Sequence, residues 1–182
     1  MFTVEIYGSP VLRTKALQVE SFDDGLKTFA AQLVETMKAE DGVGLAAPQV
    51  ARSIRVAVID ATGGEKPPFV LVNPTITFFS DEREDYEEGC LSVPEIRIKI
   101  NRPSRVSVRA FDVDGKEYVI EDASGLLARA LQHEIDHLDG ILFVDRASPV
   151  QRQLVSGKLK KLARSHKRGG RSVPSSGESR PL

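Results

Sequence analysis

The spacing of hydrophobic residues along the chain predicts helices over residues 22–40 and 125–139. In both segments apolar side chains recur three or four positions apart, which is the period of a helix that buries one face. Ser21, with Asp24 three residues on, predicts a capping box at the first helix, and Ser124 is the expected cap of the second. Both helices are therefore expected to pack on a core.

A third helix is expected from Pro149 to about Arg164, because proline after a serine is typical of a first helical turn. Residues 41–49, DGVGLAAPQ, are expected to form a glycine-rich loop. Elsewhere short apolar runs and alternating patterns favour strands. These strands are expected over 54–60, 68–74, 96–100 and 105–112, with one more after a hairpin turn at Asp114-Gly115. Residues 75–79 are expected to continue the second of them after Pro74. Helices and strands in separate runs fit an α+β fold.

Composition limits the class of protein. The 182 residues suffice for one domain, and 41% hydrophobic residues can bury an ordinary core. No apolar run is long enough to span a membrane, and the start, MFTVEIYGSP, shows no signal or transit peptide. The single cysteine excludes an internal disulfide and fits a reducing compartment, so we expect a cytoplasmic protein.

Charge is distributed unevenly, although the net charge is only −1. Residues 152–182 contain nine Lys or Arg and one acidic residue, which leaves the preceding part with a net charge of −9. An acidic body with a basic end indicates an anionic partner for that end. The last stretch, 167–182, is rich in Gly, Ser and Pro, and we expect it to be disordered.

The candidate chemistry begins with HEIDH at residues 133–137. On the expected helix His133 and His137 share a face, so both can bind one metal ion, with Glu134 beside it. The helix has an apolar side and should be buried, where imidazoles and carboxylates need polar partners. By itself the pattern is typical of zinc proteases, and it also occurs by chance in unrelated proteins.

The third ligand has to come from elsewhere in the chain. Phe143 stands where a metzincin has its third histidine, and the only glutamate after Glu134 is Glu178 near the C-terminus. His166 lies in the basic end. Cys90 is the best candidate, although a buried free cysteine is often only a small hydrophobic residue. Two His and one Cys would leave a fourth position open for water, as in catalytic sites.

Three motifs in this order resemble the peptide deformylase family: GVGLAAPQ at 42–49, EGCLS at 88–92 and HEIDH at 133–137. GSPVLRTKA near the N-terminus and VNP at 72–74 also resemble family segments. The resemblance implies mixed or antiparallel sheets around a central helix carrying HEIDH, with an N-terminal and a C-terminal helix. It implies a hydrolase that removes the formyl group from the N-terminal formyl-methionine of newly made proteins, and it argues against a protease.

The resemblance also implies catalytic roles. Water at the metal would attack the formyl group, with Glu134 as general base and then acid. Donors to the developing oxyanion would be the metal, the Gln49 amide and the backbone N–H of Leu91. The implied natural metal is Fe(II), while zinc, nickel or cobalt also suit Cys with two His. A scaffold that had lost catalysis and bound RNA is the alternative, which intact Gln49, Cys90 and Glu134 argue against.

Substrate contacts are implied as well. Gly42 and Gly44 would let the backbone approach the peptide, although Gly42 could simply serve a tight turn. Arg97 matches a family arginine near the end of the substrate, with a solvated strand residue as the alternative. Arg129 is expected at the rim of the methionine pocket with its head in water. The pocket, with His133 at its base, is expected to be lined by Val43, Leu126 and Ala130.

Three residues are expected to orient the metal ligands: Glu88, Asp136 and Arg102, with Arg102 as the partner of Asp136. Plain surface ion pairs are the competing interpretation.

The expected organisation is a catalytic domain over 1–147, a basic helix over 148–166 and a disordered tail over 167–182. In bacterial family members a C-terminal helix contacts the ribosome, and this basic helix is similar, with Leu154 and Leu162 expected to dock it on the body. A solvated helix that only aids solubility is the alternative. The expected partners are formylated nascent peptides and the ribosome, without a membrane, and the protein is expected to be a monomer.

Overall fold

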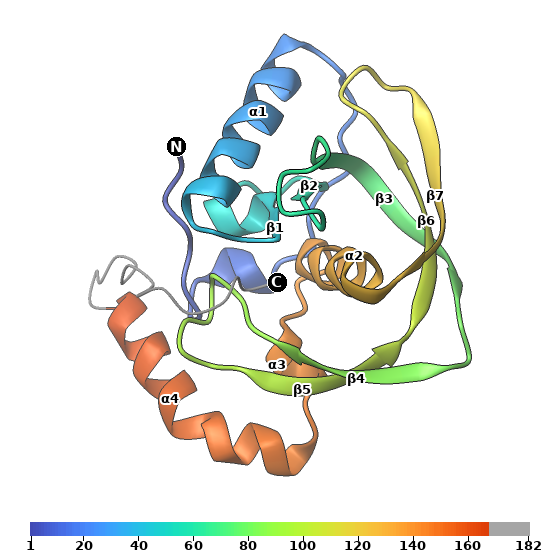
Figure 1. Cartoon of the computed structure of the whole chain (residues 1–182). Helices are drawn as coiled ribbons and strands as arrows, with labels where there is room; N and C mark the ends of the chain where they lie inside the picture. Colours follow the sequence, from blue (N-terminus) through green and yellow to red (C-terminus); the bar gives the residue numbers. More distant parts are fainter. Residues whose placement is uncertain (168–182) are drawn as a thin grey trace.

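The structure, a computed structural model, describes residues 1–167 (Figure 1). The helices are α1 (Asp24–Ala39), α2 (Gly125–Leu138), α3 (Phe143–Arg146) and α4 (Pro149–Lys167), with short 3-10 helices η1 (Pro10–Arg13) and η2 (Ala47–Val50). The strands are β1 (Gly44–Ala46), β2 (Val56–Ile59), β3 (Phe69–Phe79), β4 (Arg83–Glu88), β5 (Ile98–Pro103), β6 (Arg105–Phe111) and β7 (Glu117–Ser124). The predicted α+β class is confirmed.

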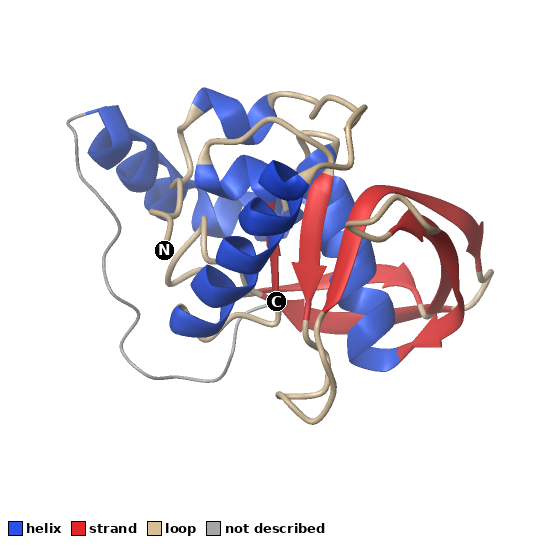
Figure 2. Cartoon of the chain, turned by 90° about the horizontal axis from the view of Figure 1, so that it is seen from above, coloured by secondary structure: helices blue, strands red, loops and turns tan. Residues whose placement is uncertain are grey.

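One antiparallel sheet of five strands, in the order β1-β2-β3-β6-β7, curves around α2 (Figure 1). Successive side chains of a strand point to opposite faces, and β2 shows why its sequence is apolar throughout. Ala57 and Ile59 pack in one core cluster with residues of α2, whereas Val56 and Val58 pack in another with residues of α1. Seen from above, most strands lie on one side of the molecule and most helices on the other (Figure 2).

A second sheet consists only of β4 and β5, which pair antiparallel from Arg83↔Pro103 to Glu88↔Ile98. Ile98 and Ile100 of β5 belong to a third core cluster with Cys90, Phe143 and residues of α4. The acidic run that becomes β4 was not predicted as a strand, because five of its six side chains are exposed and no apolar alternation marks it.

Several predicted boundaries were wrong. Asp23, not Ser21, caps α1, and its carboxylate accepts a hydrogen bond from the N–H of Leu26 at 2.9 Å. By contrast, the expected continuation of the second strand past Pro74 is confirmed, because residues 69–79 form the single strand β3, with the proline at a register shift. The loop expected over 41–49 contains β1, which pairs with β2, and η2.

Helix α4 packs on the body through one apolar face. Leu159 is 5% exposed, and Val155 and Leu162 pack beside it against the third core cluster. The expectation for Leu162 agrees with this packing, but the one for Leu154 was wrong, because Leu154 is 80% exposed. Gly8 permits the close approach: a Cβ there would lie 2.8 Å from the Cα of Ala163.

The predicted disordered tail lies outside the described residues, apart from Lys167 at its start. Within residues 1–167, none of the helices is both long and apolar enough to cross a membrane.

Candidate active site

Helix α2 and the segment after β4 bring the three predicted metal ligands together. His133 and His137 lie one helical turn apart with ring centroids at 4.9 Å, and both are buried. Cys90, two residues after the end of β4, places its Sγ 3.2 Å from Nε2 of His137. One ligand atom from each residue lies within 4.8 Å of the others.

The donor set fits a divalent metal ion. Among the described residues, no protein group hydrogen-bonds to Nε2 of His133, although this atom is buried. A buried polar nitrogen without a partner is costly, and a metal ion would supply the partner. One thiolate and two imidazoles suit zinc and other first-row metals, and three protein ligands leave a position for water.

Glu134 follows His133 on α2, and its side chain is buried. Within residues 1–167 neither of its carboxylate oxygens accepts a hydrogen bond. Burial raises the pKa of Glu134 to about 7, with nearby Glu88 adding to the effect and His133 opposing it. A carboxyl group with this pKa can take and return a proton near neutral pH. From the sequence, Gly44 was expected to let the backbone approach the substrate. The structure gives a second reason for a glycine at this position, because Gly44 lies against the carboxylate of Glu134.

Gln49 and Leu91 lie beside the ligands. Oε1 of Gln49 accepts a hydrogen bond from the N–H of Ala46 at 2.8 Å, which turns the Nε2 group toward the site. That group donates to Sγ of Cys90 at 3.5 Å and to Oγ of Ser92 at 3.2 Å. Leu91 directly follows Cys90, so its backbone N–H belongs to the same turn. The structure therefore gathers both predicted oxyanion donors next to Cys90.

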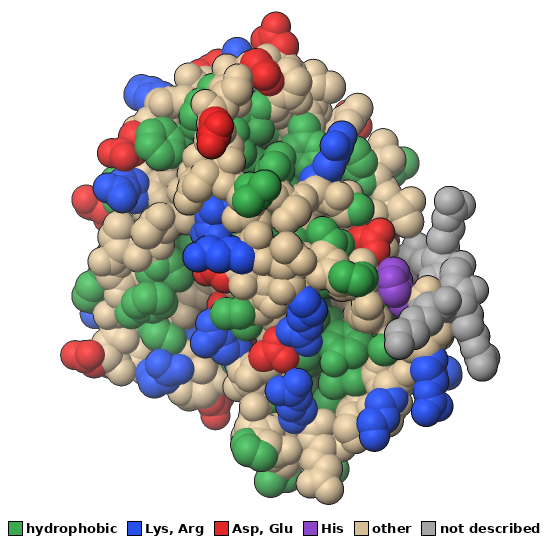
Figure 3. Space-filling view, turned by 180° about the vertical axis from the view of Figure 1, so that it is seen from behind, with side chains coloured by type: hydrophobic (Ala, Val, Ile, Leu, Met, Phe, Trp, Pro, Cys, Tyr) green, Lys and Arg blue, Asp and Glu red, His purple; other side chains and the backbone are tan. Residues whose placement is uncertain are grey.

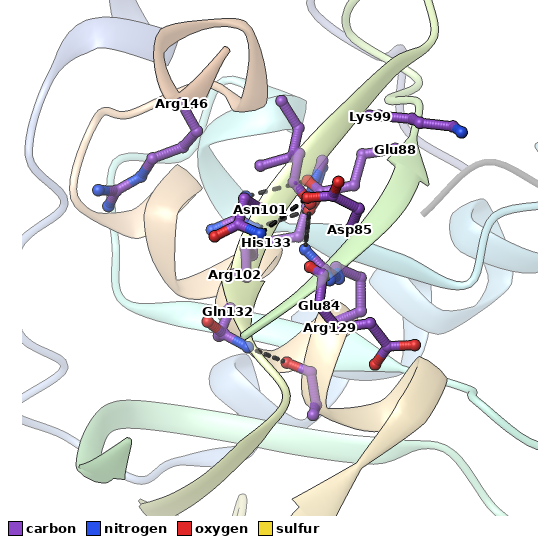
Figure 4. Close-up of polar contacts among 12 residues, drawn as sticks. Glu84, Asp85, Glu88, Lys99, Asn101, Arg102, Arg129, Gln132, His133 and Arg146 are labelled. Atoms are coloured by element: carbon purple, nitrogen blue, oxygen red, sulfur yellow. Dashed lines mark hydrogen bonds and ion pairs between the residues drawn. The ribbon is translucent and has the colours of Figure 1, made fainter. Parts of the chain in front are cut away.

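Glu88 connects the ligands to a buried charge network (Figure 4). Its carboxylate is fully buried and accepts from Nε of Arg102 at 2.6 Å and from Nη2 at 2.9 Å. A further contact of 3.1 Å joins it to Nδ1 of His133, and Arg102 also reaches Asp136 at 2.6 Å. Because Glu88 occupies Nδ1 of His133, Nε2 remains for a metal. Arg102 thus contacts Asp136, as expected from the sequence.

Burial and neighbours set the protonation of this network. Burial acts to raise the pKa of Glu88, but hydrogen bonds from His133 and Arg102 outweigh it and lower the pKa to about 2. Burial acts to lower the pKa of His133, but the neighbouring Cys90 and the contact with Glu88 raise it well above its usual value. Burial and the neighbouring His133 lower the pKa of His137 well below 6.5. A metal on Nε2 of His133 would take the place of a proton there.

Two further arginines contact this network. Arg129 was predicted to keep its head in water, and this was wrong: it is 4% exposed and donates to Glu88 at 3.1 Å. Its burial could have been expected from the sequence, because Arg129 lies four residues before His133 on a helix that faces the core. Arg146 was missed, and its guanidinium donates to Asp136 at 2.6 Å. No motif in the sequence marks Arg146, which lies in the short helix α3.

The predicted substrate residues differ in how deeply they are buried. Val43 and Ala130 are buried in the cluster that packs on α2, and Leu126 is partly buried beside them. A Cβ at Gly42 would lie 3.1 Å from the side chain of Leu91. Arg97 is exposed and lies close to Gly89. A Cβ added at Gly89 would be 3.6 Å from the guanidinium of Arg97.

The likeness to known proteins covers most of the chain. The family model described as polypeptide deformylase matches residues 1–153. The chain belongs to the peptide deformylase family. A peptide deformylase of Brucella suis is 50% identical over 160 residues, covering 87% of this chain and 91% of the relative. A peptide deformylase of Acinetobacter baumannii is 47% identical over 162 residues, covering 89% of this chain and 92% of the relative.

Solved deformylase structures agree with the fold. A crystal structure of a peptide deformylase from Legionella pneumophila matches with a TM-score of 0.83 at 42% identity, over 92% of this chain and 98% of that one. One from Plasmodium falciparum matches with a TM-score of 0.86 at 36% identity, over 91% and 97%. The chain is therefore a metal-dependent hydrolase that removes N-formyl groups, as the sequence predicted.

Proposed function

We propose that this chain removes the formyl group from the N-terminal formyl-methionine of newly made proteins, with Glu134 as general base beside a metal held by Cys90, His133 and His137. One observation carries the assignment. The three ligand atoms converge within 4.8 Å, and the carboxylate of Glu134, which has no hydrogen-bond partner among residues 1–167, is buried next to them. When bound, a divalent metal would lower the pKa of a coordinated water and polarise the formyl oxygen.

Glu134 moves the proton. It takes a proton from the attacking water as the water oxygen bonds to the formyl carbon. It then gives that proton to the peptide nitrogen as the C–N bond breaks, which releases formate and a free amino terminus. Its pKa of about 7 suits both steps.

Gln49 and Leu91 would stabilise the oxyanion. The Nε2 group of Gln49 is held in place by the contact of Oε1 with Ala46, so it need not reorganise during the reaction. The backbone N–H of Leu91 supplies the second protein donor. Loss of one such donor typically raises the barrier by roughly 2.7–4 kcal/mol.

Substrate binding is proposed for the residues around this centre. The methionine side chain would lie against Val43, Leu126 and Ala130, which pack in one apolar cluster. The backbone of Gly42 and Gly44 would pair with the peptide in the manner of an added strand. The exposed guanidinium of Arg97 would face the continuing chain. These contacts would favour a methionine as the first residue of the substrate.

Glu88, Asp136 and Arg102 would orient the metal ligands through the network described above. Fe(II) is the proposed metal, and the ligand set also accommodates zinc, nickel or cobalt. The proposed location is the cytoplasm, where formylated chains are made, and the proposed state is a monomer.

We also propose that α4 docks the protein on the ribosome. Lys158, Lys161 and Arg164 are exposed on this helix, while Leu159 on another side is buried against the body. Basic side chains gather on the face of the molecule that includes α4 (Figure 3). Residues 1–147 would then be the catalytic part, and 148–166 the docking helix.

The test of docking is co-sedimentation with ribosomes at rising salt. Reversing the charges of Lys158, Lys161 and Arg164 to Glu should abolish binding and leave formate release from a short peptide unchanged. Phosphate contacts lose affinity steeply as salt rises, because counterions are released. Substitution tests docking more specifically than deletion of α4, because the deletion would also remove Leu159 from the core. Binding that survives the substitutions would rule out this helix as the docking element.

The test of the activity is formate release from formyl-Met-Ala-Ser by protein purified without oxygen. We expect release of formate and of the free tripeptide, without cleavage of its internal peptide bonds. The same peptide without the formyl group serves as the control substrate. Internal cleavage without formate would support a protease and overturn the proposal.

A further inference from the structure

We propose that Arg129 is a positioning residue for the metal site, which ties the strands leading to Cys90 to the helix that carries the two histidines. The inference rests on the proposed function, because it takes Cys90, His133 and His137 as metal ligands.

Arg129 reaches across from α2 to both strands of the small sheet (Figure 4). Its Nη2 donates to the backbone oxygen of Glu84 on β4 at 2.8 Å. Its Nη1 donates to the backbone oxygen of Ile100 on β5 at 3.0 Å and to Oε1 of Glu88 at 3.1 Å. The guanidinium also lies over the ring of Tyr86, 5.6 Å from its centroid. The buried side chain of Arg129 therefore connects α2 to both β4 and β5.

The small sheet needs such a connection. Within residues 1–167, strands β4 and β5 pair only with each other and share no ladder with the five-stranded sheet. Cys90 follows β4 by two residues, whereas its partners His133 and His137 lie on α2. The separation of the thiolate from the imidazoles therefore depends on how the β4–β5 pair docks on α2. Arg129 lies one turn before His133 on that helix and contacts both strands. In the described part of the chain, the other hydrogen bonds between the pair and α2 each involve one strand: Arg102 to Asp136 and Gln132 to the oxygen of Pro103 on β5, and His133 to Glu88 on β4.

Arg129 acts on Glu88 as well. Arg102 divides its donors between Glu88 and Asp136, and Arg129 adds a second cation at Oε1 of Glu88. Oε2 of the same carboxylate contacts Nδ1 of His133 at 3.1 Å. A carboxylate held from two sides cannot rotate away from the imidazole. Such partners typically change metal affinity by roughly 10–100-fold when they are removed.

The experiment compares Arg129→Met and Arg129→Lys with the wild type, each loaded with Co(II). Arg129→Met removes the charge and all three hydrogen bonds, and Arg129→Lys keeps the charge but cannot make all three. The matched control is Arg105→Met, because Arg105 forms an exposed ion pair with Asp122 at 3.0 Å on the other sheet. The readouts are the Co(II) dissociation constant, the visible absorption of bound Co(II), and kcat and KM for a formyl peptide.

We expect Arg129→Met to weaken Co(II) binding roughly 10–100-fold, to shift the Co(II) absorption bands, and to lower kcat more than it raises KM. The Co(II) affinity and kcat of Arg129→Lys should lie between those of Arg129→Met and the wild type. Those of Arg105→Met should match the wild type.

Wild-type Co(II) affinity and absorption in Arg129→Met, even with a lowered Tm, would reduce Arg129 to a structural role and overturn the inference. If Arg129→Met does not fold, the same result in Arg129→Lys overturns it. Wild-type protein that binds Co(II) but releases no formate would instead contradict the proposed function and leave the affinity comparison intact.

Discussion

Glu134 lies directly against Gly44: a Cβ at residue 44 would overlap Oε1 of Glu134 and would be 2.8 Å from its carboxyl carbon. The two residues come from different elements, since Gly44 begins β1 and Glu134 lies on α2. The carboxylate can occupy its position beside the metal ligands only because residue 44 has no side chain. The glycine of the GVGLAAPQ motif and the glutamate of HEIDH therefore form one unit.

Substitution of Gly44 by alanine should displace Glu134 and abolish most activity. We expect Gly44→Ala to lower kcat/KM for a formyl peptide by about 100-fold or more, because misplacing a catalytic group by about 1 Å has effects of this size. Metal content, measured by atomic absorption, should stay at the wild-type level. Gly157→Ala is the control, since a Cβ there meets nothing within 4 Å. Near-native turnover in Gly44→Ala would contradict the packing relationship.

Removal of the Glu134 carboxylate should separate catalysis from metal binding. We expect Glu134→Ala to bind metal as tightly as the wild type, because Glu134 is not a ligand, while formate release falls by orders of magnitude. Titration with Co(II) and a formate assay on the same sample check both statements. Loss of metal would mean that Glu134 is a ligand, and retained turnover would mean that another group is the base.

Replacement of the thiolate should weaken the metal site. In Cys90→Ser a hydroxyl, a harder and poorer ligand for these metals, takes the place of the sulfur. Metal content after dialysis should therefore fall well below that of the wild type. The Fe(II) form of the wild type should lose activity in peroxide, which oxidises thiolates. Full metal retention in Cys90→Ser together with peroxide resistance would argue against Cys90 as a ligand.

Two leucines of α4 should differ in their effect on stability. Leu159 is 5% exposed in the core cluster that contains Cys90, whereas Leu154 is 80% exposed. Leu159→Ala should lower the free energy of unfolding by about 2–5 kcal/mol. Leu154→Ala should change it by less than about 0.5 kcal/mol. Urea unfolding of both variants provides the measurement, and equal effects would contradict the observed docking of α4.

The parts of the fold that were predictable are those with regular apolar patterns. Helix α2 and the hairpin of β6 and β7 follow from spacing and from a turn at Asp114-Gly115, because these signals are local. Strand β4 was not predictable in this way, since its pairing with β5 stabilises a segment with exposed, mostly acidic side chains. The N-cap of α1 was displaced by two residues because Ser21, Asp23 and Asp24 are all competent caps.

The residues of the candidate site also differ in how far the sequence could predict them. Cys90, His133, Glu134 and His137 could be proposed from residue type and spacing, since metal chemistry restricts the choice. The position of Arg129 on the face of His133 was a signal for its burial, but its partners were not predictable, because Arg129 contacts Glu84 and Ile100 through backbone oxygens that no side-chain pattern reveals. Arg146 was missed for a related reason: its contact with Asp136 depends on the turn that follows α2.

The most direct test of the account is metal reconstitution with formate release as the readout. The protein is stripped of metal with a chelator, dialysed without oxygen, and titrated with Fe(II) while formate release from formyl-Met-Ala-Ser is measured. We predict no activity in the stripped protein and a linear return of activity that ends at one equivalent of Fe(II). Full activity without metal, or bound Fe(II) without formate release, would contradict the account.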